Sequence, residues 1–266
     1  MELTVIISYY KAIDNLRLIL KAFNLQSNNN FDVIVSEDDY NEETITFLLE
    51  NKHLYKYQIT HLFQENDQGF RKNMMLNQSI LKCRTELIAF IDGDCIPHRY
   101  FVDEYIKNIK DGYFYSGRSV MLGEKISSKI KKHQTLGKLN FLSLITSDSK
   151  TIKESIYWPF FPLAIKNRGM CGRNWGINKK YLIEVNGFDE DYTRAGVGED
   201  VDIEWRLISY GLIRKPIKNK AIVYHIYHTR KYSEEGVWKN YEMLNNKKLS
   251  NNVRCLNGIE ALGNGG

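Results

Sequence analysis

The sequence predicts an α/β fold in which a mostly parallel central sheet is flanked by helices. Short, β-branched apolar runs alternate with segments whose apolar residues recur at helical spacing through the first half of the chain. Parallel neighbours need a crossover connection, and a helix normally supplies it. Of the 266 residues, 43% are hydrophobic and 26% are charged, so we expect one large folded core rather than disorder.

The predicted elements alternate from the amino terminus onward. The first strand covers 3–7, and the helix after it carries Leu16, Ile19, Leu20 and Phe23 at helical spacing, with Asp14 or Asn15 as its cap. The later elements of this half are strands over 31–35, 59–63 and 87–91 and helices around 45–49 and 71–83. Beyond Gly117 we expect a helix with a mobile segment over 123–157, helices over 179–185 and 199–209, a strand over 221–224 and a frayed tail from 262.

The formal net charge of +5 comes from 37 basic and 32 acidic residues, an excess too small to indicate nucleic acid. It fits an anionic substrate or an acidic membrane surface. Basic residues gather over 125–138, which is typical of either a solvated helix face or a contact with anionic lipid. The four widely spaced cysteines, with no signal peptide or long apolar run, predict a cytoplasmic protein whose membrane contact is peripheral.

The sharpest local motif is Asp92-Gly93-Asp94, which follows the apolar run 87–91. Ligands of parallel sheets bind beyond the carboxyl ends of the strands. Two carboxylates separated by one residue can share a hard divalent cation, and the glycine lets the backbone turn closely around it. The alternative is a plain Asp-Gly turn without a metal.

Polar and aromatic residues also follow the first two predicted strands. Ser8, Tyr9 and Tyr10 follow the first strand, and Glu37 and Asp38 follow the second. The aromatic pair offers a stacking surface for a base, and a carboxylate accepts hydrogen bonds from a pyrimidine N–H or from ribose hydroxyls. Surface turn acids are the alternative. A G-x-G-x-x-G motif is absent after the first strand, which argues against a dinucleotide site.

The order of these motifs resembles the inverting family-two glycosyltransferases. The matching segments are TVIIS at 4–8, VIVSED at 33–38, QE at 64–65, GFRK at 69–72, Asn77 and FIDGD at 90–94. A second set is similar to the carboxyl-terminal segment of galactosyl- and N-acetylgalactosaminyltransferases, including chondroitin-polymerase-like enzymes: NGFDE at 186–190, GEDVD at 198–202 and RL at 206–207. The resemblance implies a GT-A, Rossmann-like fold with a smaller acceptor-binding carboxyl-terminal part.

The resemblance also implies roles for the donor-site residues. Asp94 is expected to bind a divalent metal, Mn²⁺ or Mg²⁺, directly, and Asp92 to contact the ribose or a metal-bound water. Glu37 and Asp38 are expected at the uracil or ribose. Arg71 and Lys72 are expected near the nucleotide, where their charge can meet phosphate, although an exposed helix start explains them as well.

Catalysis is expected from the second half of the chain. The resemblance makes Asp200 the general base and Glu199 the residue that positions the acceptor or donor sugar; a helix-capping acid is the alternative for this pair. His225 is the expected further metal ligand, with His228 kept as the alternative. Trp175 lies in the segment 173–176, where the family has a glycine-rich turn that lines the sugar pocket, so its ring faces either a sugar or the core.

Together these expectations describe a single displacement with inversion, from a nucleoside-diphosphate sugar, with UDP favoured, to a saccharide or lipid-linked oligosaccharide. The role fits bacterial surface polysaccharide synthesis at the inner face of the membrane. Residues 1–117 are the expected nucleotide-sugar-binding half and 118–266 the acceptor-binding and catalytic-base half of one continuous GT-A domain. The competing hypotheses are a nucleotidyl or phosphoryl transferase and a non-catalytic nucleotide-sugar-binding protein.

Overall fold

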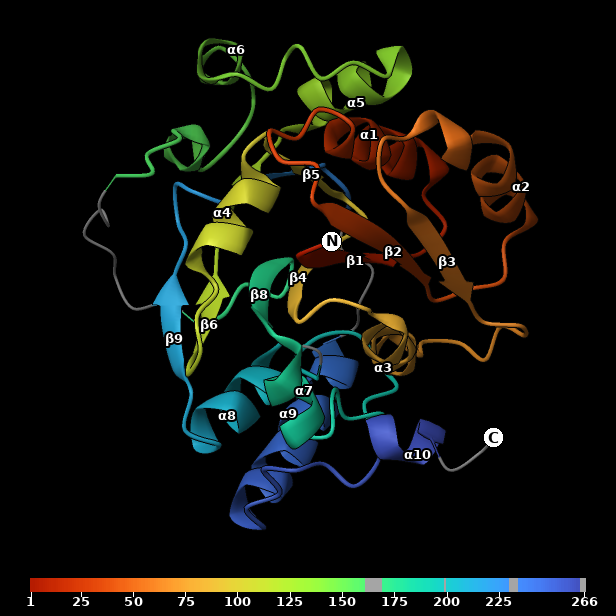
Figure 1. The fold of residues 1–266 in the computed structure, drawn as a ribbon, viewed down its shortest axis with the longest axis vertical. Helices are drawn as coiled ribbons and strands as arrows, with labels where there is room; N and C mark the ends of the chain where they lie inside the picture. Colours follow the sequence, from red (N-terminus) through yellow and green to blue (C-terminus); the bar gives the residue numbers. More distant parts are fainter. Residues whose placement is uncertain (161–168, 199, 230–233, 264–266) are drawn as a thin grey trace.

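A computed structural model describes residues 1–160, 169–198, 200–229 and 234–263 (Figure 1). Its strands are β1 (Leu3–Tyr9), β2 (Phe31–Glu37), β3 (Ile59–Phe63), β4 (Leu87–Asp92), β5 (Cys95–Pro97), β6 (Tyr113–Ser116), β7 (Arg118–Met121), β8 (Asn174–Asn178), β9 (Ile213–Pro216) and β10 (Ile222–His225). Its helices are α1 (Ile13–Phe23), α2 (Glu42–Asn51), η1 (Lys52–Leu54), α3 (Lys72–Lys82), α4 (Phe101–Asn108), α5 (Glu124–His133), α6 (Phe141–Ile145), η2 (Ile152–Ser155), α7 (Lys179–Glu184), α8 (Val201–Ser209), α9 (Glu234–Leu249) and α10 (Ile259–Gly263).

The described strands form two sheets. The larger has seven strands in the order β3-β2-β1-β4-β8-β6-β9, and the smaller has three in the order β5-β10-β7. In the larger sheet, β1 pairs in parallel with β2 and β4, and β2 with β3. The exception is β8, which lies antiparallel to both β4 and β6. The mostly parallel sheet predicted from the sequence is confirmed.

Helices cover both faces of the larger sheet because its central strands are apolar on both sides. Along β1, Val5 and Ile7 face one core, which also contains apolar residues of α1 and α4, whereas Ile6 faces the other. The second core also contains apolar residues of α3, α7 and α8. Figure 1 shows α1 and α2 on one side of the sheet and α3, α7 and α8 on the other.

The sequence-based boundaries are wrong at three places. Neither Asp14 nor Asn15 caps α1: the helix begins after Ala12, with no side-chain cap. The expected glycine-rich turn over 173–176 is instead largely strand β8. The expected frayed tail begins inside α10, although 264–266 lie outside the described residues.

Among the described helices, none combines the length and the hydropathy that a bilayer-spanning segment requires.

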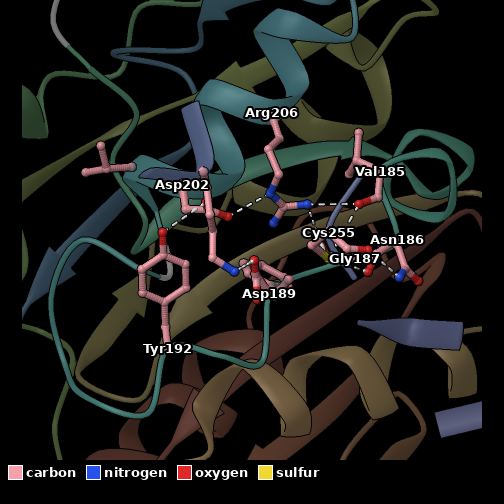
Figure 2. Close-up of polar contacts among 12 residues, drawn as sticks. Val185, Asn186, Gly187, Asp189, Tyr192, Asp202, Arg206 and Cys255 are labelled. Atoms are coloured by element: carbon pink, nitrogen blue, oxygen red, sulfur yellow. Dashed lines mark hydrogen bonds and ion pairs between the residues drawn. The ribbon is translucent and has the colours of Figure 1, made fainter. Parts of the chain in front are cut away.

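A buried ion pair attaches α8 to the turn that follows α7 (Figure 2). The Nε of Arg206 donates to Oδ2 of Asp202 at 2.7 Å, and both side chains are almost completely buried. The Nη1 of Arg206 also donates to the backbone carbonyls of Val185, at 2.9 Å, and Gly187, at 2.7 Å. One guanidinium therefore connects a carboxylate of α8 to two carbonyl groups that no regular element satisfies.

Helix α3 binds the same turn from the amino-terminal half of the chain. The side-chain amide of Asn77 donates to the carbonyl of Phe188 and accepts from its N–H, both at 2.8 Å. Gly187 has a φ of +71°, and a Cβ there would lie 2.3 Å from Oδ1 of Asn77, so only glycine fits. The turn thus fixes α8 relative to α3.

We expect Arg206→Met to lower the free energy of unfolding by about 3–5 kcal/mol, because it leaves the Asp202 carboxylate buried without its charged partner. Denaturant unfolding followed by circular dichroism measures the change. The exposed pair Lys107–Asp103 provides the control: Lys107→Ala is expected to cost less than about 1 kcal/mol. An Arg206→Met variant as stable as the wild type would show that the ion pair does not attach α8.

Candidate active site

The turn between β4 and β5 is packed tightly against β1. The N–H of Gly93 donates to the carbonyl of Ser8 at 2.6 Å. A Cβ at Gly93 would lie 3.0 Å from that oxygen and 3.1 Å from the Cα of Tyr9. A side chain at this position would crowd the backbone of β1, so glycine suits a turn that places Asp92 and Asp94 at the carboxyl end of the central strands.

Pairing of β5 with β10 brings two histidines to Asp94. His225 lies opposite Cys95 in this antiparallel pair, and the N–H of Ile226 donates to the carbonyl of Asp94 at 2.8 Å. The Nε2 atoms of His225 and His228 lie 3.3 Å and 3.0 Å from Oδ2 of Asp94. Both histidines that the sequence left as alternatives therefore reach the same carboxylate.

This cluster has the composition of a divalent-metal site. One ligand atom each from Asp94, His225 and His228 lies within 4.8 Å of the others. Burial opposes ionisation of Asp94, but the bonds from the two histidines outweigh it and hold the pKa of this carboxyl well below its usual range. The same contact raises the pKa of His228. A carboxylate oxygen with two imidazole nitrogens is a donor set that a divalent metal ion can take.

Asp200 lies at a cavity of about 450 Å³ that Asp92 also lines. It is the amino-terminal cap of α8, where its Oδ1 accepts from the N–H of Val201 at 2.8 Å. Burial raises the pKa of Asp200, the positive charge of Lys72 lowers it and the negative charge of Asp92 raises it again. A Cβ at Gly172 would lie 2.8 Å from the Cβ of Asp200, so the turn before β8 passes directly beside this carboxylate.

Basic side chains share that cavity with the two carboxylates. Lys72, at the start of α3, donates from Nζ to Oδ1 of Asp92 at 3.0 Å. Arg173 and Arg118 line the cavity as well, and Arg173 is near enough to Asp92 and Asp94 for their charges to raise its pKa, although its burial acts in the opposite direction. Acidic and basic side chains therefore line the same cavity at one end of the sheet.

The acids after β2 are buried and hydrogen-bonded. Oε2 of Glu37 lies 2.7 Å from Nε2 of His61 on β3. Asp38 accepts from the side-chain amide of Gln64 at 2.7 Å and from the backbone N–H of Arg71 at 3.0 Å. Burial raises the pKa of Asp38 to about 6. The Arg71 guanidinium donates to the carbonyl of Phe70.

The predicted aromatic residues divide between core and surface. Trp175 is only 1% exposed and stacks on Phe90 with ring centroids 4.4 Å apart, which favours the core alternative for this ring. Tyr9 is also buried, with its hydroxyl bonded to Thr44, whereas Tyr10 is 55% exposed.

The predicted residue Glu199 lies outside the described residues.

The fold also brings to the site residues that were not predicted from the sequence. His61 and Arg173 were not singled out as site residues, because a lone histidine in a strand and an arginine in an expected turn carry no signal until the fold places them beside Glu37 and Asp92. Lys72 was expected near the nucleotide together with Arg71, and the structure places its Nζ beside Oδ1 of Asp92.

Several solved structures share this fold. The structure of TarS residues 1–349 from S. aureus in complex with UDP has a TM-score of 0.62 and 13% identity, covering 94% of this chain and 66% of that one. A mannosyltransferase from Pyrobaculum calidifontis in complex with GDP-Man and Mn²⁺ has a TM-score of 0.60 and 13% identity, covering 87% and 58%. GalNAc-T7 with UDP, GalNAc and Mn²⁺ has a TM-score of 0.62 and 14% identity, covering 91% and 47%. The chain thus spans only part of the length of each.

The family follows from the sequence itself. No curated protein sequence matches the chain. Residues 4–184, more than half of the 266, match the profile described as Glycosyl transferase family 2. The match ends before the segment 186–207, so the resemblance of that segment to chondroitin-polymerase-like enzymes stays a prediction. With its α/β architecture, central sheet and structural likenesses, the chain belongs to glycosyl transferase family 2 and has the GT-A fold.

Proposed function

We propose that this chain is a metal-dependent, inverting glycosyltransferase that moves a sugar from a nucleoside diphosphate, UDP favoured, to a saccharide hydroxyl. The observation that supports it most is the cavity shared by Asp200 and Asp92, since Asp92 is two residues from Asp94 and its two histidines. Structures with this fold hold UDP or GDP-mannose, which supports a nucleotide-sugar donor.

The donor binds along the carboxyl ends of β1, β2 and β4 in this proposal. Glu37 and Asp38 face the base or ribose, with Ser8 and Tyr10 beside them, and Lys72 and Arg173 meet the diphosphate with positive charge. Asp94, His225 and His228 hold the divalent ion, Mn²⁺ or Mg²⁺, which when bound stabilises charge on the leaving diphosphate.

Asp200 acts as the general base. Its carboxylate takes the proton of the acceptor hydroxyl while the hydroxyl oxygen forms a bond to the anomeric carbon. The bond from that carbon to the diphosphate oxygen breaks, and the diphosphate leaves with the electron pair. Attack opposite the leaving group inverts the anomeric configuration, and no covalent enzyme intermediate forms. Glu199 is proposed to position the sugar.

The acceptor is proposed to be a saccharide or a lipid-linked oligosaccharide in bacterial surface polysaccharide synthesis. A lipid-linked acceptor lies at the inner face of the membrane, which a cytoplasmic enzyme reaches by peripheral contact. The basic segment 125–138 supports this part of the proposal.

Removing the metal ligands is expected to abolish most of the transfer. Asp94→Ala is expected to lower turnover by about 10²–10³-fold, because charge on the leaving diphosphate loses its stabilisation. Release of nucleoside diphosphate from a panel of nucleotide sugars with Mn²⁺ measures it. Asp111→Ala, which removes an exposed carboxylate at a distant ion pair, is the control. Wild-type turnover in Asp94→Ala would eliminate the proposed metal site.

The variant Asp200→Asn distinguishes the role of general base from the role of helix cap, because asparagine caps helices as well as aspartate does but is not a carboxylate base. We expect kcat to fall by about 10²–10⁴-fold with donor affinity and folding unchanged. Asn178→Ala, which removes the cap of α7 away from the cavity, is the opposite control: it is expected to lose some stability and keep its activity. Comparable kcat values for Asp200→Asn and the wild type would assign Asp200 to capping alone.

The pH dependence follows from the burial of Asp200, which raises its pKa. A base must be deprotonated, so kcat/KM is expected to fall as the pH drops through a pKa above about 3.9, the ordinary value for aspartate. Initial rates between pH 4 and pH 8 measure this limb. A rate that stays constant down to pH 4 would contradict a raised pKa at the base.

A further inference from the structure

Two consecutive helices, α5 and α6, carry a surface that the sugar-transfer chemistry does not use. We call the solvent-facing side of residues 124–150 the α5–α6 surface; Figure 1 shows both helices at the same end of the molecule. Helix α5 turns Ile126, Ser127 and Ile130 inward. Its exposed side carries Lys125, Lys129 and Lys132. The helix thus packs by one face and presents lysines on the other.

Helix α6 presents large apolar side chains at the same end of the molecule. Leu144 is buried, whereas Phe141, Leu142 and Ile145 are 41%, 78% and 54% exposed. The chain after α6 returns to the start of α5, where the N–H of Lys125 donates to Oδ2 of Asp148 at 2.9 Å. A short backbone pairing of Met121 with Lys150 also fixes this return. The exposed apolar side chains of α6 and the exposed lysines of α5 therefore lie at the same end of the molecule.

The charge of this surface is not neutralised locally. Residues 124–150 contain six lysines, together with Glu124 and Asp148 as the acidic residues. None of the six lysines forms an ion pair with a carboxylate in the described part of the chain, whereas α4 and α9 contain the i,i+4 pairs Lys107–Asp103 and Lys239–Glu235. On an ordinary solvated helix face, lysines pair with acidic side chains one turn away. The six lysines of this surface form no such pairs with the described carboxylates, so their positive charge is available to an anionic partner.

We propose that the α5–α6 surface binds the surface of an anionic lipid bilayer. Lysines near anionic headgroups are attracted to them, and exposed apolar side chains gain from leaving water for the acyl boundary. The two kinds of side chain together match a bilayer. A polyanion without an apolar phase, such as a nucleic acid, would use the lysines and leave Phe141, Leu142 and Ile145 in water.

The surface is physically connected to the candidate metal site. Oγ of Ser127, on the inner face of α5, accepts from the backbone N–H of Tyr227 at 2.9 Å, between His225 and His228. The bilayer-facing helix therefore contacts the segment that carries both histidines. This inference deepens the proposed function, and rests on it only for the acceptor: a docked enzyme would hold its cavity near a lipid-linked saccharide.

The test is sedimentation of the full chain, without substrate, with vesicles of phosphatidylglycerol and phosphatidylcholine, compared with phosphatidylcholine alone. The variant is Lys129→Glu/Leu142→Glu. Its matched control is Lys248→Glu/Leu249→Glu on α9, where Leu249 is 85% exposed and Figure 1 shows the helix at the opposite end of the molecule. We expect binding to the anionic vesicles that weakens by more than about tenfold in the first variant and not in the control.

Several results would overturn the proposal: no sedimentation of the wild type with anionic vesicles, equal binding by the first variant, or full binding by Leu142→Glu alone, which would indicate a general polyanion site. Dissociation of a dimer by the first variant in analytical ultracentrifugation would assign the surface to a second copy. Nucleoside diphosphate release without vesicles is expected to be unchanged in both variants, so a failure here is distinguishable from a failure of the proposed transferase activity.

Discussion

The antiparallel pairing of β5 with β10 is the constraint on which the candidate site depends. β5 follows Asp94 directly, and β10 ends at His225, so this pairing joins residues more than 100 positions apart in the sequence. The contact of Gly93 with the Ser8 carbonyl anchors the turn to the central strand. Because both contacts are made by backbone atoms, the Asp94 carboxylate and the buried His225 imidazole are held in place before any ligand arrives, whereas the His228 side chain is 50% exposed.

The position of Asp200 depends on a different kind of interaction. The guanidinium of Arg206 and the side-chain amide of Asn77 hold one turn between α3 and α8, and Asp200 begins α8. Burial is costly for both carboxylates, but it acts differently on them. Asp94 has two histidines as partners and stays ionised easily, whereas Asp200 has weaker compensation and its pKa rises. The fold therefore lowers the pKa of Asp94, as a metal ligand requires, and raises the pKa of Asp200, as suits a general base.

Local sequence was enough to predict the alternating strands and helices up to β4, because the strands are short apolar runs and the apolar residues of the helices recur at helical spacing. It also singled out Asp92 and Asp94 at a strand end, whereas Asp200 was expected only from the family resemblance, and the roles of all three stay predictions. It did not predict β8, whose Trp175 and Ile177 alternate with Asn174 and Gly176 over only five residues and which becomes a strand between β4 and β6. The pairing of Glu37 with His61 was equally invisible, because it depends on the register of two neighbouring strands.

A crystal structure grown with UDP and Mn²⁺, with an anomalous difference map recorded at the manganese edge, tests the proposed site most directly. We expect a peak coordinated by Asp94 and at least one of His225 and His228, with the diphosphate beside it and Asp200 facing the open part of the cavity. A manganese peak away from Asp94, or a nucleotide bound where Asp200 cannot face its diphosphate end, would contradict the proposed site.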